Sequence, residues 1–147
     1  MQTRIPCVLM RGGTSRGPFF LASDLPEDPQ LRDEVLLAVM GSPHDYQVDG
    51  IGGASPLTSK VAIISKSRHA GIDIDYLFAQ VFINEKLVDT KPNCGNMLIA
   101  VAPFAIESGL VPARHPETTV RILNVNTQAV VDSIVQTPNG KVTYSGD

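Results

Sequence analysis

The run Asn93-Cys94-Gly95-Asn96, followed by the apolar stretch of residues 97–108, decides the fold of this chain. The stretch is long enough for a helix, and its apolar residues fall on most sides of that helix rather than along one stripe. A helix of this kind is buried. We therefore predict a central helix over residues 97–108, ended by Gly109, with the rest of the chain folded around it.

Strands are predicted on both sides of the central helix. Short β-branched and apolar runs alternate with turns that are rich in glycine, proline and asparagine, a pattern typical of a sheet. An amphipathic helix is also predicted over residues 29–40, with Gly41 as its stop. This gives an α+β architecture, in which several strands wrap round one buried helix and the second helix lies outside. The predicted strands are residues 6–10, 19–22, 60–65, 76–83, 119–124, 129–136 and 141–147.

Composition limits the class of protein. The 147 residues fit one domain, and 43% hydrophobic with 18% charged residues is a globular composition. The net charge of −3 comes with basic residues scattered along the chain, so neither nucleic acid nor an anionic membrane is expected as a partner. No apolar run reaches the about 20 residues that cross a bilayer. Residues 1–6 do not have the apolar character of a secretory signal.

We expect a cytoplasmic protein. In a reducing cytosol Cys7 and Cys94 are both expected to be free thiols, and Cys7, which lies inside an apolar run, is expected in the core. The last run, residues 141–147, is predicted as a strand with nothing after it. We therefore expect the chain to be a fragment of a longer protein.

Cys94 is the first candidate for chemistry. At the start of the predicted central helix, unpaired N–H groups and the positive end of the helix dipole would lie beside the sulfur, and both stabilise a thiolate. Gly95 would let a ligand approach the backbone, while Asn93 and Asn96 can cap the helix or donate hydrogen bonds. The alternative is a buried structural cysteine, which is the commoner state of a cysteine. The polar neighbours favour a reactive thiol.

Lys60 is the second candidate. It enters an apolar strand directly after the glycine-rich segment of residues 49–56. A lysine that begins a strand is usually solvated. Between glycine backbone and apolar walls it would instead be partly desolvated and suited to accept a proton near neutral pH. The residues alone leave both interpretations open.

The segment Arg11-Gly12-Gly13-Thr14-Ser15-Arg16-Gly17 is predicted as a loop that binds anionic oxygens. It combines guanidinium groups, hydroxyls and glycine N–H groups, which suit a carboxylate or phosphate. The spacing is not that of a P-loop, and the alternative is an ordinary β-turn. His44, His69 and His115 are isolated in polar contexts, so they are expected at the surface and no metal site is predicted.

Together these motifs resemble the PrpF family, which contains 2-methylaconitate cis-trans isomerases and 4-oxalomesaconate tautomerases. The resemblance runs from end to end of the chain and is specific because the motifs occur in this order. Residues 4–10 and 89–92 look most like the tautomerase branch. The motifs are Arg11-Gly12-Gly13-Thr14-Ser15-Arg16-Gly17, Asp49-Gly50-Ile51-Gly52-Gly53, Thr58-Ser59-Lys60-Val61, Asp75-Tyr76-Leu77-Phe78-Ala79-Gln80-Val81 and Asn93-Cys94-Gly95-Asn96.

The resemblance implies a diaminopimelate-epimerase-like fold, in which two similar halves each wrap a mixed sheet round a central helix. The active site would lie between the halves. Family members are longer, so residues 1–147 would be the N-terminal half without its C-terminal partner. The resemblance also implies that Lys60 and Cys94 are the catalytic acid/base pair, with no cofactor and no metal. The expected substrate-binding residues are Arg11, Gly12, Gly13, Thr14, Ser15, Ser59, Asn93, Gly95 and Asn96.

The resulting hypothesis is an allylic isomerase or tautomerase that shifts a proton along an unsaturated di- or tricarboxylate such as 4-oxalomesaconate or 2-methylaconitate. Lys60 is favoured as the base and Cys94 as the acid. One alternative is a racemase or epimerase of the same fold, which uses two cysteines, one from each half. Another is a truncated domain that binds carboxylates without turnover. Such a domain would self-associate through the apolar surface that normally faces the second half.

Overall fold

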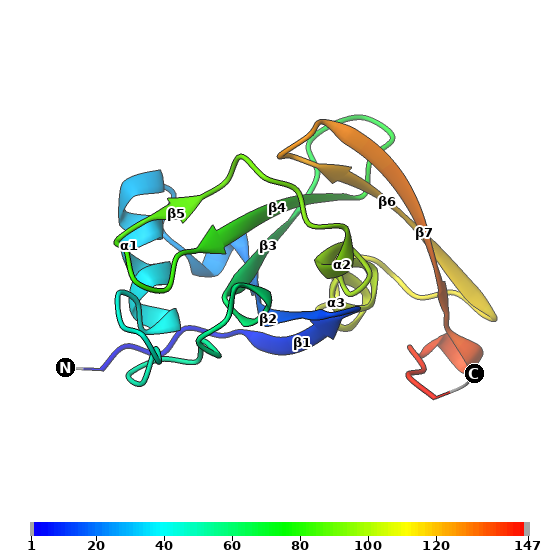
Figure 1. Cartoon of the computed structure of the whole chain (residues 1–147). Coiled ribbons are helices and arrows are strands. Elements are labelled where there is room, and N and C mark those ends of the chain that lie inside the picture. The colour runs from blue at the N-terminus through cyan, green and yellow to red at the C-terminus, as the bar shows by residue number, and fades with distance from the viewer. Residues whose placement is uncertain (1, 146–147) are drawn as a thin grey trace.

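The computed structural model describes residues 2–145, in which a mixed sheet curls round an interrupted helix (Figure 1). The strand order is β1-β2-β3-β4-β6-β7, and β5 pairs with β4 off this path. The β2–β3 and β4–β6 pairs are parallel, and the other pairs are antiparallel.

The strands are β1 (Val8–Gly12), β2 (Ser15–Leu21), β3 (Lys60–Lys66), β4 (Ile74–Val81), β5 (Val88–Asp89), β6 (Glu117–Asn124) and β7 (Ala129–Gln136). The α-helices are α1 (Pro29–Met40), α2 (Gly95–Leu98) and α3 (Val101–Glu107), and the 3₁₀-helices are η1 (Ala22–Asp24), η2 (Pro56–Thr58) and η3 (Pro138–Gly140).

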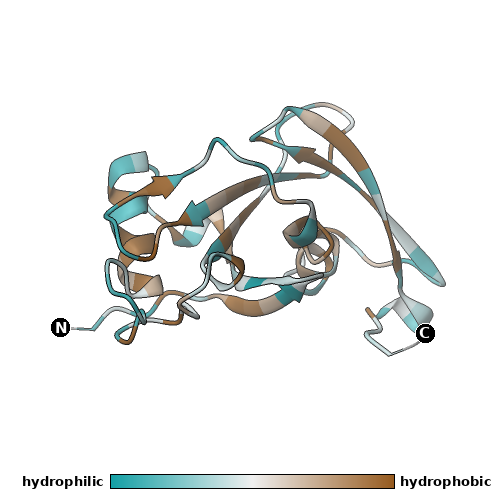
Figure 2. Ribbon diagram, viewed as in Figure 1, coloured by the Kyte–Doolittle hydropathy of each residue, from teal (hydrophilic) through white to brown (hydrophobic). Residues whose placement is uncertain are grey.

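Each face of the sheet carries an apolar layer. Side chains alternate between the two faces along a strand, so Ala62 and Ile64 of β3 pack with α2 and α3, while Val61 and Ile63 pack with α1. Figure 1 shows α1 on the outside of the curled sheet and α2 and α3 inside it. Because both faces of β3 are covered, its run is apolar without alternation (Figure 2). The predicted α+β architecture is confirmed.

The outer helix α1 has the bounds that the sequence predicts. The Asp28 side chain accepts a hydrogen bond from the Gln30 N–H at 3.4 Å, and Pro29 takes the first helical position, where its missing N–H costs nothing. Gly41 ends the helix with φ of +84°, a left-handed conformation that favours glycine. Local signals alone determine both ends of this helix.

The central helix is in two pieces, which corrects the prediction of one helix over residues 97–108. Pro103 explains the break, because its ring excludes the carbonyl of Ile99 and it has no N–H to offer that carbonyl. The chain tightens at the break: the Ile99 N–H bonds to the Asn96 carbonyl at 3.3 Å and the Ala100 N–H to the Met97 carbonyl at 3.2 Å. Both pieces contribute buried side chains to the core, so the predicted burial is confirmed.

Two other predictions are wrong. Cys7 is exposed rather than in the core, because it precedes β1, which forms an edge of the sheet. Residues 141–145 form no strand but follow η3 as irregular chain; residues 146 and 147 of that predicted strand lie outside the described residues. The three histidines are exposed, as predicted. No helix in the described part of the chain combines the length and the apolar character needed to cross a membrane.

Candidate active site

The predicted anion-binding loop of residues 11–17 is a tight hairpin. β1 and β2 pair as far as Gly12 and Ser15, which leaves Gly13 and Thr14 as the turn. Gly13 has φ of +54°, a conformation that a two-residue hairpin turn requires and that glycine adopts without strain. The residues around the turn therefore lie in paired strands, and the alternation of the strands decides where each one points.

Strand alternation turns Arg11 to the other side of the hairpin from Ser15. Residues that pair directly across two strands face the same side, so Gly12 and Ser15 face one side and the pair Arg11 and Arg16 faces the other. The Gly12 side is the side of α2, since a Cβ at Gly12 would meet the Asn96 carbonyl oxygen at 2.1 Å. Arg11 therefore faces away from Ser15 at the hairpin, and its part in substrate binding stays a prediction.

Ser15, Lys60 and Cys94 meet at the start of α2. Lys60 Nζ donates hydrogen bonds to Ser15 Oγ at 3.1 Å and to Cys94 Sγ at 3.5 Å. Ser15 Oγ also lies 3.8 Å from Cys94 Sγ. The three side chains come from β2, β3 and the N-cap of α2, so the sheet brings together residues that are far apart in the sequence. Lys60 Nζ also lies 5.9 Å from the centre of the Phe78 ring, within the range of a cation–π contact.

Cys94 lies at the start of α2, as the sequence predicts, and is itself the N-cap of α2 in place of Asn93 or Asn96. Its sulfur accepts a hydrogen bond from the Met97 N–H at 3.4 Å. Because α2 has only 4 residues, the polar contacts of the sulfur are local ones, with the Met97 N–H and with Lys60 Nζ. Cys94 is 5% exposed. It is thus a buried cysteine whose sulfur nevertheless contacts polar side chains.

Tyr76 is hydrogen-bonded to the backbone of Cys94. Its hydroxyl donates to the Cys94 carbonyl oxygen at 3.2 Å. Burial raises the pKa of Tyr76, and the charge of Cys94 raises it further, so the phenol remains a protonated donor. Sequence reasoning missed this residue, although a tyrosine inside an apolar strand needs a hydrogen-bond partner for its hydroxyl.

Asn96 connects the hairpin turn to α2. Its Nδ2 donates to Thr14 Oγ1 at 2.9 Å. A Cβ at Gly13 would lie 2.6 Å from Asn96 Oδ1, so Gly12 and Gly13 are needed for this close packing. Gly95 differs, because nothing lies within 4 Å of the position of its Cβ. Its backbone borders open space beside Cys94, which leaves room for a ligand.

Ser59 does not reach the open side of the site. It is fully buried; its hydroxyl donates to the Val81 carbonyl at 2.7 Å and accepts from Gln47 Nε2 at 2.8 Å. Gln47 Oε1 in turn accepts from the Ala54 N–H at 2.9 Å. This network anchors the glycine-rich segment before Lys60. The contact of Ser59 with substrate stays a prediction, which the buried bonds of its hydroxyl do not favour; Ser59 lies just before β3, with φ of −125° and ψ of 47°.

The site therefore contains most of the predicted set. Asn93 is exposed, and its Oδ1 accepts a hydrogen bond from Asn124 Nδ2. Nowhere in residues 2–145 do three histidine, cysteine, aspartate or glutamate side chains gather as a metal site would require. The residues that gather at the start of α2 are Gly12, Gly13, Thr14, Ser15, Lys60, Cys94, Gly95 and Asn96.

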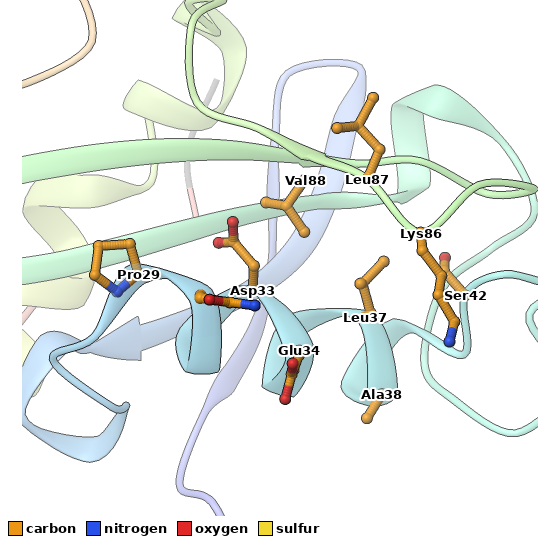
Figure 3. A pocket seen from close by; sticks show the side chains of 10 residues that line it. Pro29, Asp33, Glu34, Leu37, Ala38, Ser42, Lys86, Leu87 and Val88 are labelled. Atoms are coloured by element: carbon orange, nitrogen blue, oxygen red, sulfur yellow. The ribbon is translucent and has the colours of Figure 1, made fainter.

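A separate hollow of about 740 Å³ lies between α1 and the turn before β5 (Figure 3). Asp33 and Leu37 of α1 and Lys86 of the turn line it. None of the residues that gather around Cys94 takes part in it. The candidate active site is defined by the contacts of its side chains rather than by this hollow.

Comparison with solved structures defines the class of fold. A hydroxyproline epimerase from Agrobacterium vitis superposes with a TM-score of 0.58 at 16% identity, over 92% of this chain and 38% of that chain. At this identity the likeness shows the fold alone. It confirms the predicted diaminopimelate-epimerase-like fold, here carrying a lysine–cysteine pair.

Closer relatives identify the family. The crystal structure of a methylitaconate-delta-isomerase superposes with a TM-score of 0.95 at 50% identity, over 99% of this chain and 65% of that chain. The 4-oxalomesaconate tautomerase of Pseudomonas putida is 58% identical over 146 residues, which are 99% of this chain and 40% of that protein. The family model described as PrpF protein matches residues 2–147, and the chain belongs to this family. It spans about two fifths of the length of the curated relatives it matches.

Proposed function

We propose that the chain is the N-terminal half of a cofactor-independent isomerase that shifts a proton between two carbons of an unsaturated di- or tricarboxylate. The observation that carries the proposal is the direct contact between Lys60 Nζ and Cys94 Sγ, 3.5 Å apart. The names of a tautomerase of 4-oxalomesaconate and an isomerase of methylitaconate among the relatives support this substrate class.

The geometry of the pair suits a 1,3-shift. Inversion at one carbon needs an acid and a base on opposite faces of that carbon. Lys60 and Cys94 are in hydrogen-bond contact on one wall of the site, so they cannot stand on either side of a single carbon. Two groups on the same wall can instead serve two carbons of an allylic system on one face. This geometry excludes only an epimerase that uses Lys60 and Cys94 as its two groups; against an epimerase with a second cysteine from the other half speak the relatives named as a tautomerase and an isomerase of unsaturated carboxylates.

The proposed reaction uses both groups in turn. Lys60 accepts a proton from the carbon next to the conjugated system, and the electron pair of the C–H bond moves into the conjugated carboxylate or keto group as a dienolate. The Cys94 thiol gives its proton to the carbon two positions along, which moves the double bond. The Lys60 ammonium then returns a proton to the thiolate across their direct contact, which restores both groups without a cofactor.

Neutral donors of this half are proposed to hold one substrate carboxylate. Thr14, the Asn96 amide and the backbone beside Gly95 border the open side of the site, and such fixed donors stabilise a dienolate. The other carboxylates would be held by the second half.

Val130 and Ile134 of β7 are 52% and 60% exposed; we propose that the second half or a second copy of the chain covers this apolar surface. Two free thiols support a reducing, cytoplasmic location.

The test is an assay of the full-length protein with 4-oxalomesaconate and 2-methylaconitate in deuterated water, followed by NMR. A 1,3-shift is expected to move the double bond and place solvent deuterium on the carbon that receives the proton. Exchange and inversion at one carbon, with the double bond in place, would support the epimerase alternative. No turnover of either acid, with binding retained, would support a carboxylate-binding domain.

Replacing Ser15 with alanine is expected to lower kcat by about 10- to 100-fold, with the fold retained. The hydroxyl accepts from Lys60 and lies beside Cys94, so its loss frees the Lys60 amine to move out of reaction geometry. The matched control is Ser65→Ala on β3, whose side chain lines a hollow apart from the site and whose loss should leave kcat unchanged. Equal rates for the two variants would contradict the role of Ser15.

A further inference from the structure

The segment that carries Cys94 is irregular. Residues 90–93 lie between β5 and α2 and belong to no helix or strand. The backbone of such a segment is held in one place only where groups elsewhere in the molecule bind it in preference to water. Lys60 and Ser15 are fixed by the sheet, so the distance from Cys94 to either of them depends on what holds this segment in place.

The Asn126 side chain supplies those partners. Its Nδ2 lies 2.6 Å from the Thr90 carbonyl oxygen and 3.0 Å from that of Pro92. The same amide pairs with the backbone of Phe78: the Phe78 N–H donates to Oδ1, and Nδ2 donates to the Phe78 carbonyl, both at 2.8 Å. Three carbonyls share two amide hydrogens, so every polar group of this side chain is used.

The pairing with Phe78 anchors the segment to the core. Along the edge of β4 opposite to β3, β6 pairs with residues 74–76, and β5 pairs with Gln80 and Val81. Phe78 lies in the gap between the two partners, where the Asn126 amide takes the place of a strand residue. The Phe78 side chain is 1% exposed. Residues 90–92 are therefore tied to a position of the sheet whose side chain is packed in the core.

Two more contacts hold the same segment. The Tyr76 hydroxyl donates to the Cys94 carbonyl, and Asn124 Nδ2 donates to Asn93 Oδ1. Tyr76 and Asn124 are direct partners across β4 and β6. The last residue of β6 and the turn after it thus contact the segment before α2 at Asn93, Thr90 and Pro92.

We propose that Asn126 is a positioning residue for Cys94: by holding the Thr90 and Pro92 carbonyls, it fixes the thiol against Lys60 and Ser15. The effect on turnover rests on the proposed function, whereas the effect on the segment does not. A misplacement of about 1 Å in a catalytic group costs about 100-fold in rate. Asn126 acts through the backbone and contacts no reacting atom.

The test compares Asn126→Asp with Thr127→Ala. The aspartate keeps the shape and the acceptor for the Phe78 N–H, but it loses both amide hydrogens and turns a carboxylate toward three carbonyl oxygens. Thr127→Ala removes a contact to the Ala129 N–H in the same turn and leaves the segment untouched. Peptide-resolved hydrogen exchange of residues 90–97, with β3 as internal reference, is measured on the chain, together with the alkylation rate of Cys94 relative to the exposed Cys7.

Asn126→Asp is expected to speed exchange over residues 90–97 and relative alkylation of Cys94 about tenfold, with β3 and Thr127→Ala unchanged. In the full-length enzyme, kcat should fall about 10- to 100-fold while KM changes less than about threefold. Unchanged exchange over residues 90–97, or equal acceleration in β3, would show that Asn126 does not hold this segment in place. A loosened segment with unchanged kcat would overturn the positioning role. If the unaltered enzyme turns over neither carboxylate, the proposed function fails. The exchange and alkylation results still decide whether Asn126 holds residues 90–94 in place.

Discussion

Replacing Cys94 with serine in the full-length protein is expected to lower kcat by about 100- to 10,000-fold, the range of a lost general acid or base. A serine hydroxyl in the same place can still accept the Met97 N–H, so the fold should remain, but a hydroxyl is a far weaker acid than a thiol. The rate is measured from the absorbance change of 4-oxalomesaconate. Cys7→Ser, at the exposed cysteine, is the control and should leave kcat unchanged.

Lys60→Ala is expected to lower kcat by a similar factor, because it removes the proposed base and the donor to Cys94 Sγ. The double variant should be hardly slower than either single variant, since two groups that act as one unit do not contribute additively. Independent, multiplying effects would show that the two residues do not work as a pair. A variant within a few fold of the unaltered rate would contradict the mechanism itself.

Gly17→Ala is expected to destabilise the chain by about 3 kcal/mol or more, or to prevent folding. A Cβ at Gly17 would lie 1.7 Å from the Lys60 carbonyl oxygen, and both residues belong to strands that run side by side. The parallel pairing of β2 and β3 follows directly, at Phe19 with Ala62. The clash therefore cannot be relieved without separating two strands in the middle of the sheet. The free energy of unfolding is measured by urea denaturation followed by circular dichroism.

The matched control is Gly95→Ala, where a Cβ meets nothing within 4 Å. In the first position of α2 the alanine should leave the stability within about 1 kcal/mol of the original, toward greater stability. In the full-length enzyme the same methyl group should raise KM, because it enters the open space beside Cys94. Equal denaturation midpoints for the two variants would contradict the close approach of β2 and β3 at Gly17.

Local signals made much of the fold predictable. Asp28, Pro29 and Gly41 mark the ends of α1, and the bounds of β7 and most of β3 follow from runs of β-branched and apolar residues. The break in the central helix was predictable in principle, since Pro103 is visible in the sequence, but the uniform apolar run concealed it. Cys7 was misplaced because an apolar run can lie on an edge strand as well as in the core.

The candidate site shows where sequence reasoning ends. Motif resemblance selects Lys60 and Cys94, and the structure places them in contact. Resemblance also selects Arg11 and Ser59, which the structure turns away from that contact. A motif marks a stretch of chain, whereas a strand sends neighbouring side chains to opposite faces. The pairing register of the strands is set by the whole sheet.

The sequence by itself determined that a cysteine between polar residues begins a buried helix, and that a mixed sheet surrounds this helix. The motifs, through their resemblance to a family, also selected the pair that the proposed chemistry needs, Cys94 and Lys60. Only the tertiary structure decided that this cysteine sits within reach of Ser15 and Lys60, and that Tyr76 and Asn126 hold it there. These contacts join strands that are distant along the chain. They exist only when the register of every strand between them is correct, and no local pattern specifies that register.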